Sequence, residues 1–245
     1  MREINLLEKS HPQPTKRRIE PGWRTAENKI IARRYDKEFF DGDRVNGYGG
    51  YYYDGRWRYV AEELKKLYGI NNNSAVLDIG CAKGFLLYDL QDMIPGIKVA
   101  GIDISEYAIN KAVDGYANFL IKNQSLSEEK AREKEEETRK KVLPHMIVGN
   151  CEKLPWPDNS FDVVLSINTT HNLPIEKCKK AIQEMIRVCK NKKSMFIQVD
   201  AYRTPEEKQR MRDWILTGEV LMSVDEWIEF FKKCGYGGDY YWTIF

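Results

Sequence analysis

The residues of this sequence that could do chemistry lie where short apolar runs end in carboxylates and glycines. VLDIGCAKGF (76–85) has the pattern of a buried strand, a tight turn and the start of a helix, with Asp78 two residues before Gly80. KVAGIDIS (98–105) is a second apolar run, and Asp103 stands near its end. In Rossmann-like sites an acid at this place accepts hydrogen bonds from ribose hydroxyls. Asp103 stands 23 residues after Gly80, and an acid at this place indicates a nucleoside-containing ligand.

The turn after the first run differs from the dinucleotide fingerprint G-x-G-x-x-G. Its sequence is GCAKGF (80–85), so Phe85 stands where the third glycine would be. A pyrophosphate would also be repelled by the charge of Asp78, whereas a ligand with a positive amino group would be attracted. Alanine at position 82 costs little if its φ angle stays negative. These features disfavour a nicotinamide-dependent oxidoreductase, which stays open as the alternative enzyme class.

A histidine follows the fourth apolar run, FDVVLSIN (161–168). His171 lies three residues beyond Asn168, and ligands of open α/β sheets bind at the carboxyl ends of the strands. An imidazole there could remove a proton from a hydroxyl or an amine. Helix capping, packing or shaping of the pocket are the other interpretations of His171.

A second group of candidates lies in NGYGGYYYDGRWR (46–58). Tyr48, Tyr52 and Tyr53 offer aromatic faces, which attract cations, and phenolic hydroxyls. Arg56 could bind an anionic acceptor or could simply be solvated. We interpret this stretch as a substrate-binding wall, with core packing as the alternative.

The elements that must position these residues follow one another in a regular order. Helical patterns separate most of five short apolar runs, at 75–80, 98–105, 145–150, 161–168 and 194–200. Such alternation predicts an α/β fold with a mostly parallel sheet and helices on both faces. The last residues, GYGGDYYWTIF (235–245), predict one more strand, antiparallel and inside the sheet, because many large apolar groups need burial.

About 70 residues precede the first predicted strand. We predict an N-terminal extension and helical lid over 1–70, extended at first, with one helix at 25–40 and another that starts at Asp54 and stops at Gly69. The main domain is predicted over 71–245. Within it, 119–143 is a charged insertion, and its helix at 127–141 places acids four residues before bases. A solvated spacer explains that helix better than a docking site does.

Composition narrows the class of protein. The chain has 39 basic and 37 acidic residues, so no nucleic-acid partner is expected. No apolar run approaches the ~20 residues of a membrane helix, and no membrane association is expected. Five separated cysteines without a CxxC pair favour a reduced, cytoplasmic protein. The three histidines are scattered, so no metal is expected, and the oligomeric state is left open.

Taken in order, DIGCAKG, Asp103 and GNCEKLPWPDNSFDVVLSINTTHNL (149–173) resemble the class I (Rossmann-like) S-adenosylmethionine-dependent methyltransferases of the small-molecule type. The first motif of that family is commonly D-x-G-x-G-x-G, and Ala82 replaces its middle glycine. Asn150 stands where the family more often has Asp. The resemblance covers roughly residues 70–200, and it implies a seven-stranded Rossmann-like sheet and S-adenosyl-L-methionine as cofactor.

The resemblance also implies roles for individual residues. Those expected to bind the cofactor are Asp78, Gly80, Cys81, Ala82, Gly84, Asp103, Ile104, Asn150, Cys151, Glu152 and Asn168. His171 would be the catalytic base. The implied reaction moves a methyl group to O or N of a small polar acceptor, such as a sugar or a phosphorylated metabolite. A non-catalytic S-adenosylmethionine-binding protein is the second alternative.

Overall fold

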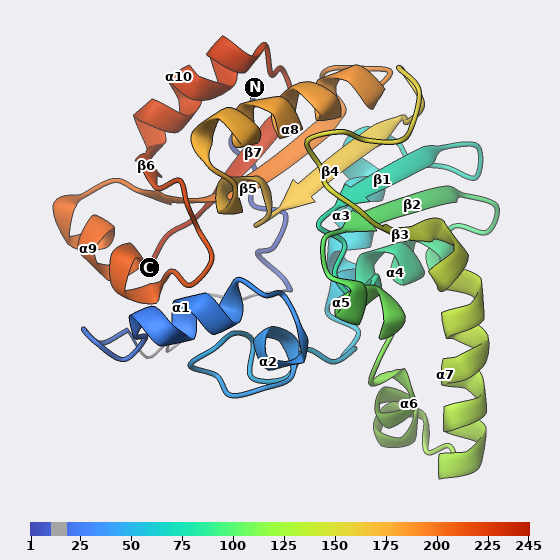
Figure 1. Ribbon diagram of the computed structural model, residues 1–245. Coiled ribbons are helices and arrows are strands. Elements are labelled where there is room, and N and C mark those ends of the chain that lie inside the picture. The colour runs from blue at the N-terminus through green and yellow to red at the C-terminus, as the bar shows by residue number, and fades with distance from the viewer. Residues whose placement is uncertain (11–18) are drawn as a thin grey trace.

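The computed structural model describes residues 1–10 and 19–245. Its centre is a seven-stranded sheet in the order β3-β2-β1-β4-β5-β6, with β7 paired to β5 (Figure 1). The strands are β1 (Ala75–Ile79), β2 (Lys98–Asp103), β3 (Met146–Val148), β4 (Val163–Ile167), β5 (Met195–Tyr202), β6 (Met222–Ser223) and β7 (Asp239–Thr243). Every pairing between these strands is parallel. The predicted fold class is confirmed.

Helices cover both faces of this sheet and also precede it. Those before the sheet are α1 (Ala26–Ala32), α2 (Lys37–Phe40) and α3 (Trp57–Tyr68). The others are α4 (Phe85–Met93), α5 (Glu106–Asn110), α6 (Tyr116–Gln124), α7 (Glu128–Val142), α8 (Ile175–Val188), α9 (Pro205–Trp214) and α10 (Val224–Cys234), with 3₁₀ turns η1 (Leu143–His145) and η2 (Thr170–Asn172). Among the described helices, none has the length and apolar character needed to cross a bilayer.

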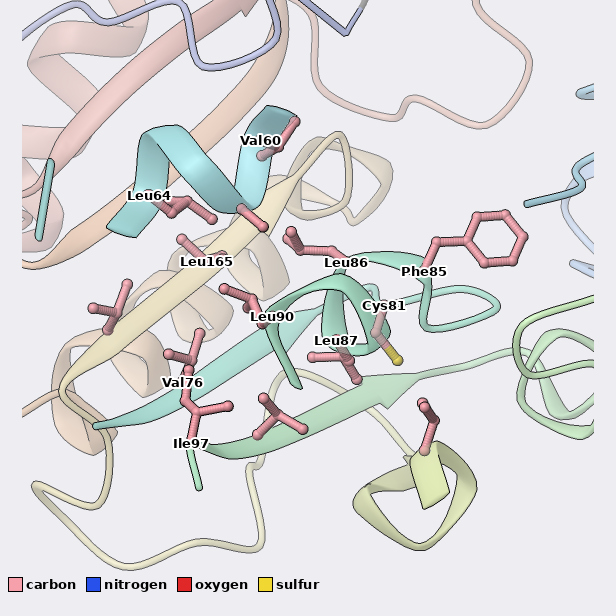
Figure 2. Packing of buried hydrophobic residues seen from close by; sticks show 14 of the residues in the cluster. Val60, Leu64, Val76, Cys81, Phe85, Leu86, Leu87, Leu90, Ile97 and Leu165 are labelled. Atoms are coloured by element: carbon pink, nitrogen blue, oxygen red, sulfur yellow. The ribbon is translucent and has the colours of Figure 1, made fainter. Parts of the chain in front are cut away.

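Alternation of side chains along the strands divides the interior into two cores. Val76 and Leu165 belong to the core under α3 and α4, whereas Leu77 and Val164 belong to the core under α8 and α10. Figure 2 shows the first core, with side chains of α3 and α4 gathered around Leu165. Asp78 follows Leu77 and therefore lies on the face of the sheet that α3 and α4 cover.

The strands are parallel, so their carboxyl ends meet at one edge of the sheet. Figure 1 shows α1 and α2 together with α9 on one side of the sheet. Arg24, just before α1, donates to the carbonyl of Trp214 at the end of α9, which confirms that these segments touch. Arg33 of the same region pairs with Glu219 at 3.0 Å. The N-terminal extension and the segment after β5 thus form one wall.

Two local predictions in the extension were wrong. The helix predicted over 25–40 is two helices, because Tyr35 adopts a φ of +51° and its carbonyl accepts from the Ser105 hydroxyl at 2.5 Å. Asp54 does not cap α3, which starts after Arg56 without a side-chain cap. Instead Asp54 accepts from the Arg56 amide at 3.1 Å. The stop at Gly69 is confirmed by its φ of +64°.

The last strand differs from its prediction in direction. β7 is parallel to β5 because α10 carries the chain back across the sheet before β7 begins. The prediction that β7 lies inside the sheet is not confirmed, because β5 is the only named strand that pairs with it among the described residues. On its other side the Ile4 amide donates to the Tyr240 carbonyl at 2.9 Å, and the Tyr240 amide donates to the Arg2 carbonyl at 3.0 Å. Residues 11–18 of the predicted extended segment lie outside the described residues.

The charged helix predicted at 127–141 is α7. Glu128 and Arg132 pair at 2.8 Å, as their four-residue spacing predicts. α7 packs on α6, where Glu135 accepts from the Ala117 amide at 2.8 Å. Figure 1 shows both helices extending away from the sheet.

Candidate active site

A cavity of about 640 Å³ lies at the carboxyl ends of the strands. Its walls come from the extension, the loops after β1, β2, β3 and β4, and the chain after β5. Eleven of the residues singled out from sequence line it: Tyr48, Asp78, Gly80, Cys81, Ala82, Asp103, Ile104, Asn150, Cys151, Asn168 and His171. The structure thus brings together most of the residues predicted from sequence.

The turn after β1 needs its glycines. Gly80 has a φ of +81°, and a Cβ there would lie 1.9 Å from the Thr169 hydroxyl. Gly84 is also left-handed and would place a Cβ 2.6 Å from the Met146 sulfur. Gly84 is therefore required for packing and does not line the cavity. The condition under which alanine at position 82 would cost little is not met, because its φ is +48°.

The strained conformation of Ala82 serves the carboxylate of Asp103. The Ala82 amide donates to Asp103 at 2.8 Å, and the Ser105 amide donates to its other oxygen at 2.8 Å. Burial raises the pKa of Asp103, while these backbone donors oppose the rise. The carboxylate at the end of β2 is thus held in one orientation at the cavity wall.

Asp78 lies in the same wall on the neighbouring strand. Its side chain is buried, and burial together with the charge of Asp103 raises the pKa of Asp78 to about 7. No described lysine or arginine contributes to that pKa. A cationic ligand group would supply the missing countercharge.

The two cysteines near this wall are not activated. Burial raises the pKa of the Cys81 thiol well above its ordinary value and that of Cys151 to about 12. Thiolates are the nucleophilic form, so both residues are packing groups at the rim of the cavity.

The loop after β3 folds on itself. Asn150 donates to the Glu152 carboxylate at 3.0 Å and accepts from the Glu152 amide at 2.9 Å. Glu152 also pairs with Lys177 at 3.2 Å, and it does not line the cavity. Asn150 lines the cavity with its amide already occupied by Glu152.

His171 belongs to η2, directly after β4, and is almost fully buried. Its Nε2 lies 3.3 Å from Oδ2 of Asp200, while Nδ1 has no hydrogen-bond partner among the described residues. The amides of Glu219 and Val220 both donate to the His171 carbonyl at 3.0 Å and fix the backbone. An imidazole beside a carboxylate is a candidate general base, and here its Nδ1 is buried.

Sequence reasoning missed Asp200. Its signal was available, because SMFIQVD (194–200) places an acid at the end of an apolar run just as Asp103 ends another. Only the packing of η2 against β5 shows that Asp200 meets His171.

A chain of hydrogen bonds crosses the ends of three strands beside His171. Gln198 of β5 donates to the Thr243 hydroxyl of β7 at 3.0 Å, and that hydroxyl donates to the Asn168 amide oxygen at 2.8 Å. Asn168, predicted to bind the cofactor, is thereby held from within the protein. Gln198 Oε1 is buried and has no partner among the described residues.

The predicted substrate wall is only partly at the cavity. Tyr48 lines it, but Tyr52, Tyr53 and Arg56 do not. The Tyr53 hydroxyl donates to the buried Asp89 carboxylate at 2.6 Å, which makes Tyr53 a core residue. Tyr52 is exposed, and Arg56 lies on the surface in an ion pair with Asp54 at 2.5 Å.

Lys83 connects the extension to the turn after β1, which the sequence did not reveal. Its ammonium group is fully buried and lies 2.8 Å from Asp41 and 2.9 Å from Asp114. Tyr107 donates to Asp41 at 2.7 Å. Burial alone would raise the pKa of Asp41, but Lys83 and Tyr107 keep that pKa below its usual value. The extension is therefore part of the folded site.

A model of a methyltransferase domain family matches residues 70–234 of this chain. The chain belongs to that methyltransferase family. The family is one of enzymes, and S-adenosylmethionine is the methyl donor that it implies.

Two relatives and one solved structure are similar to this chain, and one of the relatives is named as a methyltransferase. An uncharacterized protein of Haemophilus influenzae is 28% identical over 69% of this chain and 60% of its own length. The sterol 4-C-methyltransferase strm-1 of Caenorhabditis elegans is 29% identical over 53% of this chain and 31% of its own. This chain thus spans less than two thirds of the length of either relative. The crystal structure of the [4+2]-cyclase SpnF shares the fold, with a TM-score of 0.51, 16% identity, and 73% of this chain and 56% of that one covered.

Proposed function

We propose that this cavity binds S-adenosyl-L-methionine and that the enzyme transfers its methyl group to oxygen or nitrogen of a small polar acceptor. The observation that carries the proposal is the pair of buried carboxylates, Asp78 and Asp103, at the ends of neighbouring strands in one cavity. Asp103 would accept hydrogen bonds from the ribose hydroxyls of the cofactor, and Asp78 would form an ion pair with its ammonium group.

The residues present fit this cofactor. A Cβ at position 80 would clash with Thr169, so glycine is required there. Its bare backbone also allows a ligand to approach closely. Ile104 exposes 56% of its surface at the cavity wall, which offers an apolar face for a base. The volume of about 640 Å³ lies within the range of pockets that enclose small ligands, about 300–1,000 Å³.

The bound cofactor would supply an electrophilic methyl group on sulfur. The residues of this chain would then hold the acceptor and take its proton. His171 would accept the proton from the acceptor's hydroxyl or amine, and Asp200, 3.3 Å from its Nε2, would stabilise the imidazolium that forms. The acceptor gains the methyl group and S-adenosylhomocysteine is left. Positioning of the two partners supplies much of the rate enhancement in such a displacement.

The polar wall supports a small polar acceptor, such as a sugar or a phosphorylated metabolite. Two relatives are named as sterol methyltransferases, and that acceptor is stated of those proteins only. Here His171, Gln198 and Asp200 all line the cavity, and a polar acceptor would match these polar side chains better than an apolar one. The extension would act as the lid of the cavity, since Tyr48 lines it.

Calorimetric titration with S-adenosylhomocysteine tests the cofactor site. We expect saturable binding by the natural protein, and a weakening of roughly 10-fold or more for Asp103→Asn, because two charge-assisted hydrogen bonds are affected. Asp92→Asn is the matched control, since Asp92 does not line the cavity and pairs with Arg58 on the surface. No heat with either S-adenosylmethionine or its demethylated product would end the proposal. Release of S-adenosylhomocysteine across a panel of hydroxylated acids and sugar phosphates then tests catalysis.

A further inference from the structure

Two arginines of the extension meet one tryptophan in the wall of the cavity. The guanidinium carbon of Arg24 lies 4.0 Å from the ring centroid of Trp214, and that of Arg44 lies 5.0 Å from it. Arg24 also donates to the Arg44 carbonyl at 3.4 Å. All three residues line the cavity. Two positive groups are thus gathered around one indole ring.

Protein carboxylates do not neutralise the second of these groups. Among the described residues, Arg44 donates to the Gly47 carbonyl and forms no ion pair. Partial burial lowers the pKa of Arg44, although the residue as a whole is exposed, so its charge stays accessible to a bound molecule. Arg56 and Arg58 are different, because each pairs with a surface aspartate, Asp54 at 2.5 Å and Asp92 at 2.6 Å. Arg44 can therefore form an ion pair with the anionic group of a bound molecule.

The segment 214–218 connects the arginine pair at Trp214 to His171 and Asp200. Residues 214–218 all line the cavity, and a Cβ on Gly218 would lie 3.5 Å from His171 and 3.7 Å from Asp200. Four residues of extended chain span at most ~14 Å. A molecule of metabolite size can therefore contact Arg44 with one end and reach His171 with the other.

We propose that the acceptor is an anionic hydroxy compound, whose carboxylate or phosphate binds Arg24 and Arg44 beside Trp214 and whose hydroxyl faces His171. The proposal rests on the proposed function and names the substrate class of that same site. Guanidinium groups bind carboxylate and phosphate through paired hydrogen bonds, and they are the side chains best suited to both anions. The aromatic surface of Trp214 gives the body of the acceptor an apolar contact.

Two matched pairs of probes separate the sources of the anion. The first pair is para-hydroxybenzoate and its neutral isostere para-hydroxybenzamide, and the second is glucose 6-phosphate and glucose. Each is titrated into the natural protein saturated with S-adenosylhomocysteine, and affinity is read from tryptophan fluorescence and thermal shift. We expect the anion of one pair to bind at least ~10-fold more tightly than its neutral partner, the effect of one charge-assisted contact.

Variants then assign the effect to a residue. Arg44→Gln is expected to remove the preference for the anion and leave affinity for the neutral probe unchanged. Arg56→Gln removes the same charge outside the cavity and is expected to change neither affinity. Arg44→Lys keeps the charge, so it should retain part of the preference and guards against a purely structural loss.

The outcomes are distinguishable from failure of the cofactor site. Equal affinity for charged and neutral probes, no binding of either anion, or an unaltered preference in Arg44→Gln would each overturn the anionic acceptor, even though S-adenosylhomocysteine binds. If S-adenosylhomocysteine itself gives no heat, the proposed function fails first. In that case, binding of the anions to the protein without S-adenosylhomocysteine would support the arginine site independently of the cofactor site.

Discussion

Replacing Asp78 with Asn should make the protein more stable and its cofactor binding weaker. Burial and the charge of Asp103 raise the pKa of Asp78 from 3.8 to about 7. Above pH 4 the unfolded chain has lost this proton while the folded state still holds it. The free energy of unfolding therefore falls as pH rises from about 4 to about 7, and the whole cost is present above pH 7.

The size of the effect follows from the two pKa values. Moving the pKa from 3.8 to about 7 corresponds to roughly 4 kcal/mol of unfolding free energy at pH 8. At pH 5 the same calculation leaves roughly 1.5–2 kcal/mol. Asn carries no charge at either pH, so Asp78→Asn should gain the larger amount at pH 8 and the smaller at pH 5.

Urea denaturation of both proteins at pH 5 and pH 8 measures these gains. Calorimetry with S-adenosylhomocysteine on the same samples should show a loss of roughly 10-fold or more in affinity, as expected for one charge-assisted contact. For the natural protein, affinity should rise with pH up to about 7, as Asp78 loses its proton. A gain in stability that is equal at both pH values, or absent at pH 8, would refute the argument that Asp78 is a buried carboxylate without a countercharge.

Three further changes test other parts of the site. His171→Ala should lower kcat by roughly 100-fold with the best acceptor of the panel while S-adenosylhomocysteine binds as before; unchanged turnover would remove the role of His171 as base. Lys83→Met should cost about 3–5 kcal/mol of unfolding free energy in urea, because Asp41 and Asp114 lose their buried cation, and a cost below ~1 kcal/mol would contradict this. Ala82→Gly should raise that free energy by about 1 kcal/mol, since its φ is +48°, and a loss would show that the strain is absent.

The sheet could be predicted because its signals are local. Each strand is an apolar run, and each is bounded by residues that stop or turn the chain, so β1, β2 and β4 were located within a few residues of their positions. The direction of β7 could not be predicted this way. Its residues fit either direction equally well, and the crossover by α10 decided that it runs parallel to β5.

The proposed cofactor wall could be predicted from sequence better than the proposed acceptor wall, for a similar reason. Asp78, Gly80 and Asp103 belong to two short contiguous segments whose spacing restricts where they lie. The acceptor wall combines Arg44 with Trp214, which are far apart along the chain and meet only through packing. Tyrosines 52 and 53 looked equivalent to Tyr48 in sequence, yet only Tyr48 lines the cavity.

The sequence by itself determined the order of strands and helices, the glycine turn and the carboxylates at strand ends, because these depend on neighbours within a few residues. Only the tertiary structure decided that Asp200 lies beside His171, that Lys83 is neutralised by Asp41, and that Arg44 is not neutralised within the described chain. Those contacts form only where folding brings residues from distant segments together. Burial makes an unpaired charge costly, so their environment, and with it their chemistry, is fixed by packing between distant segments.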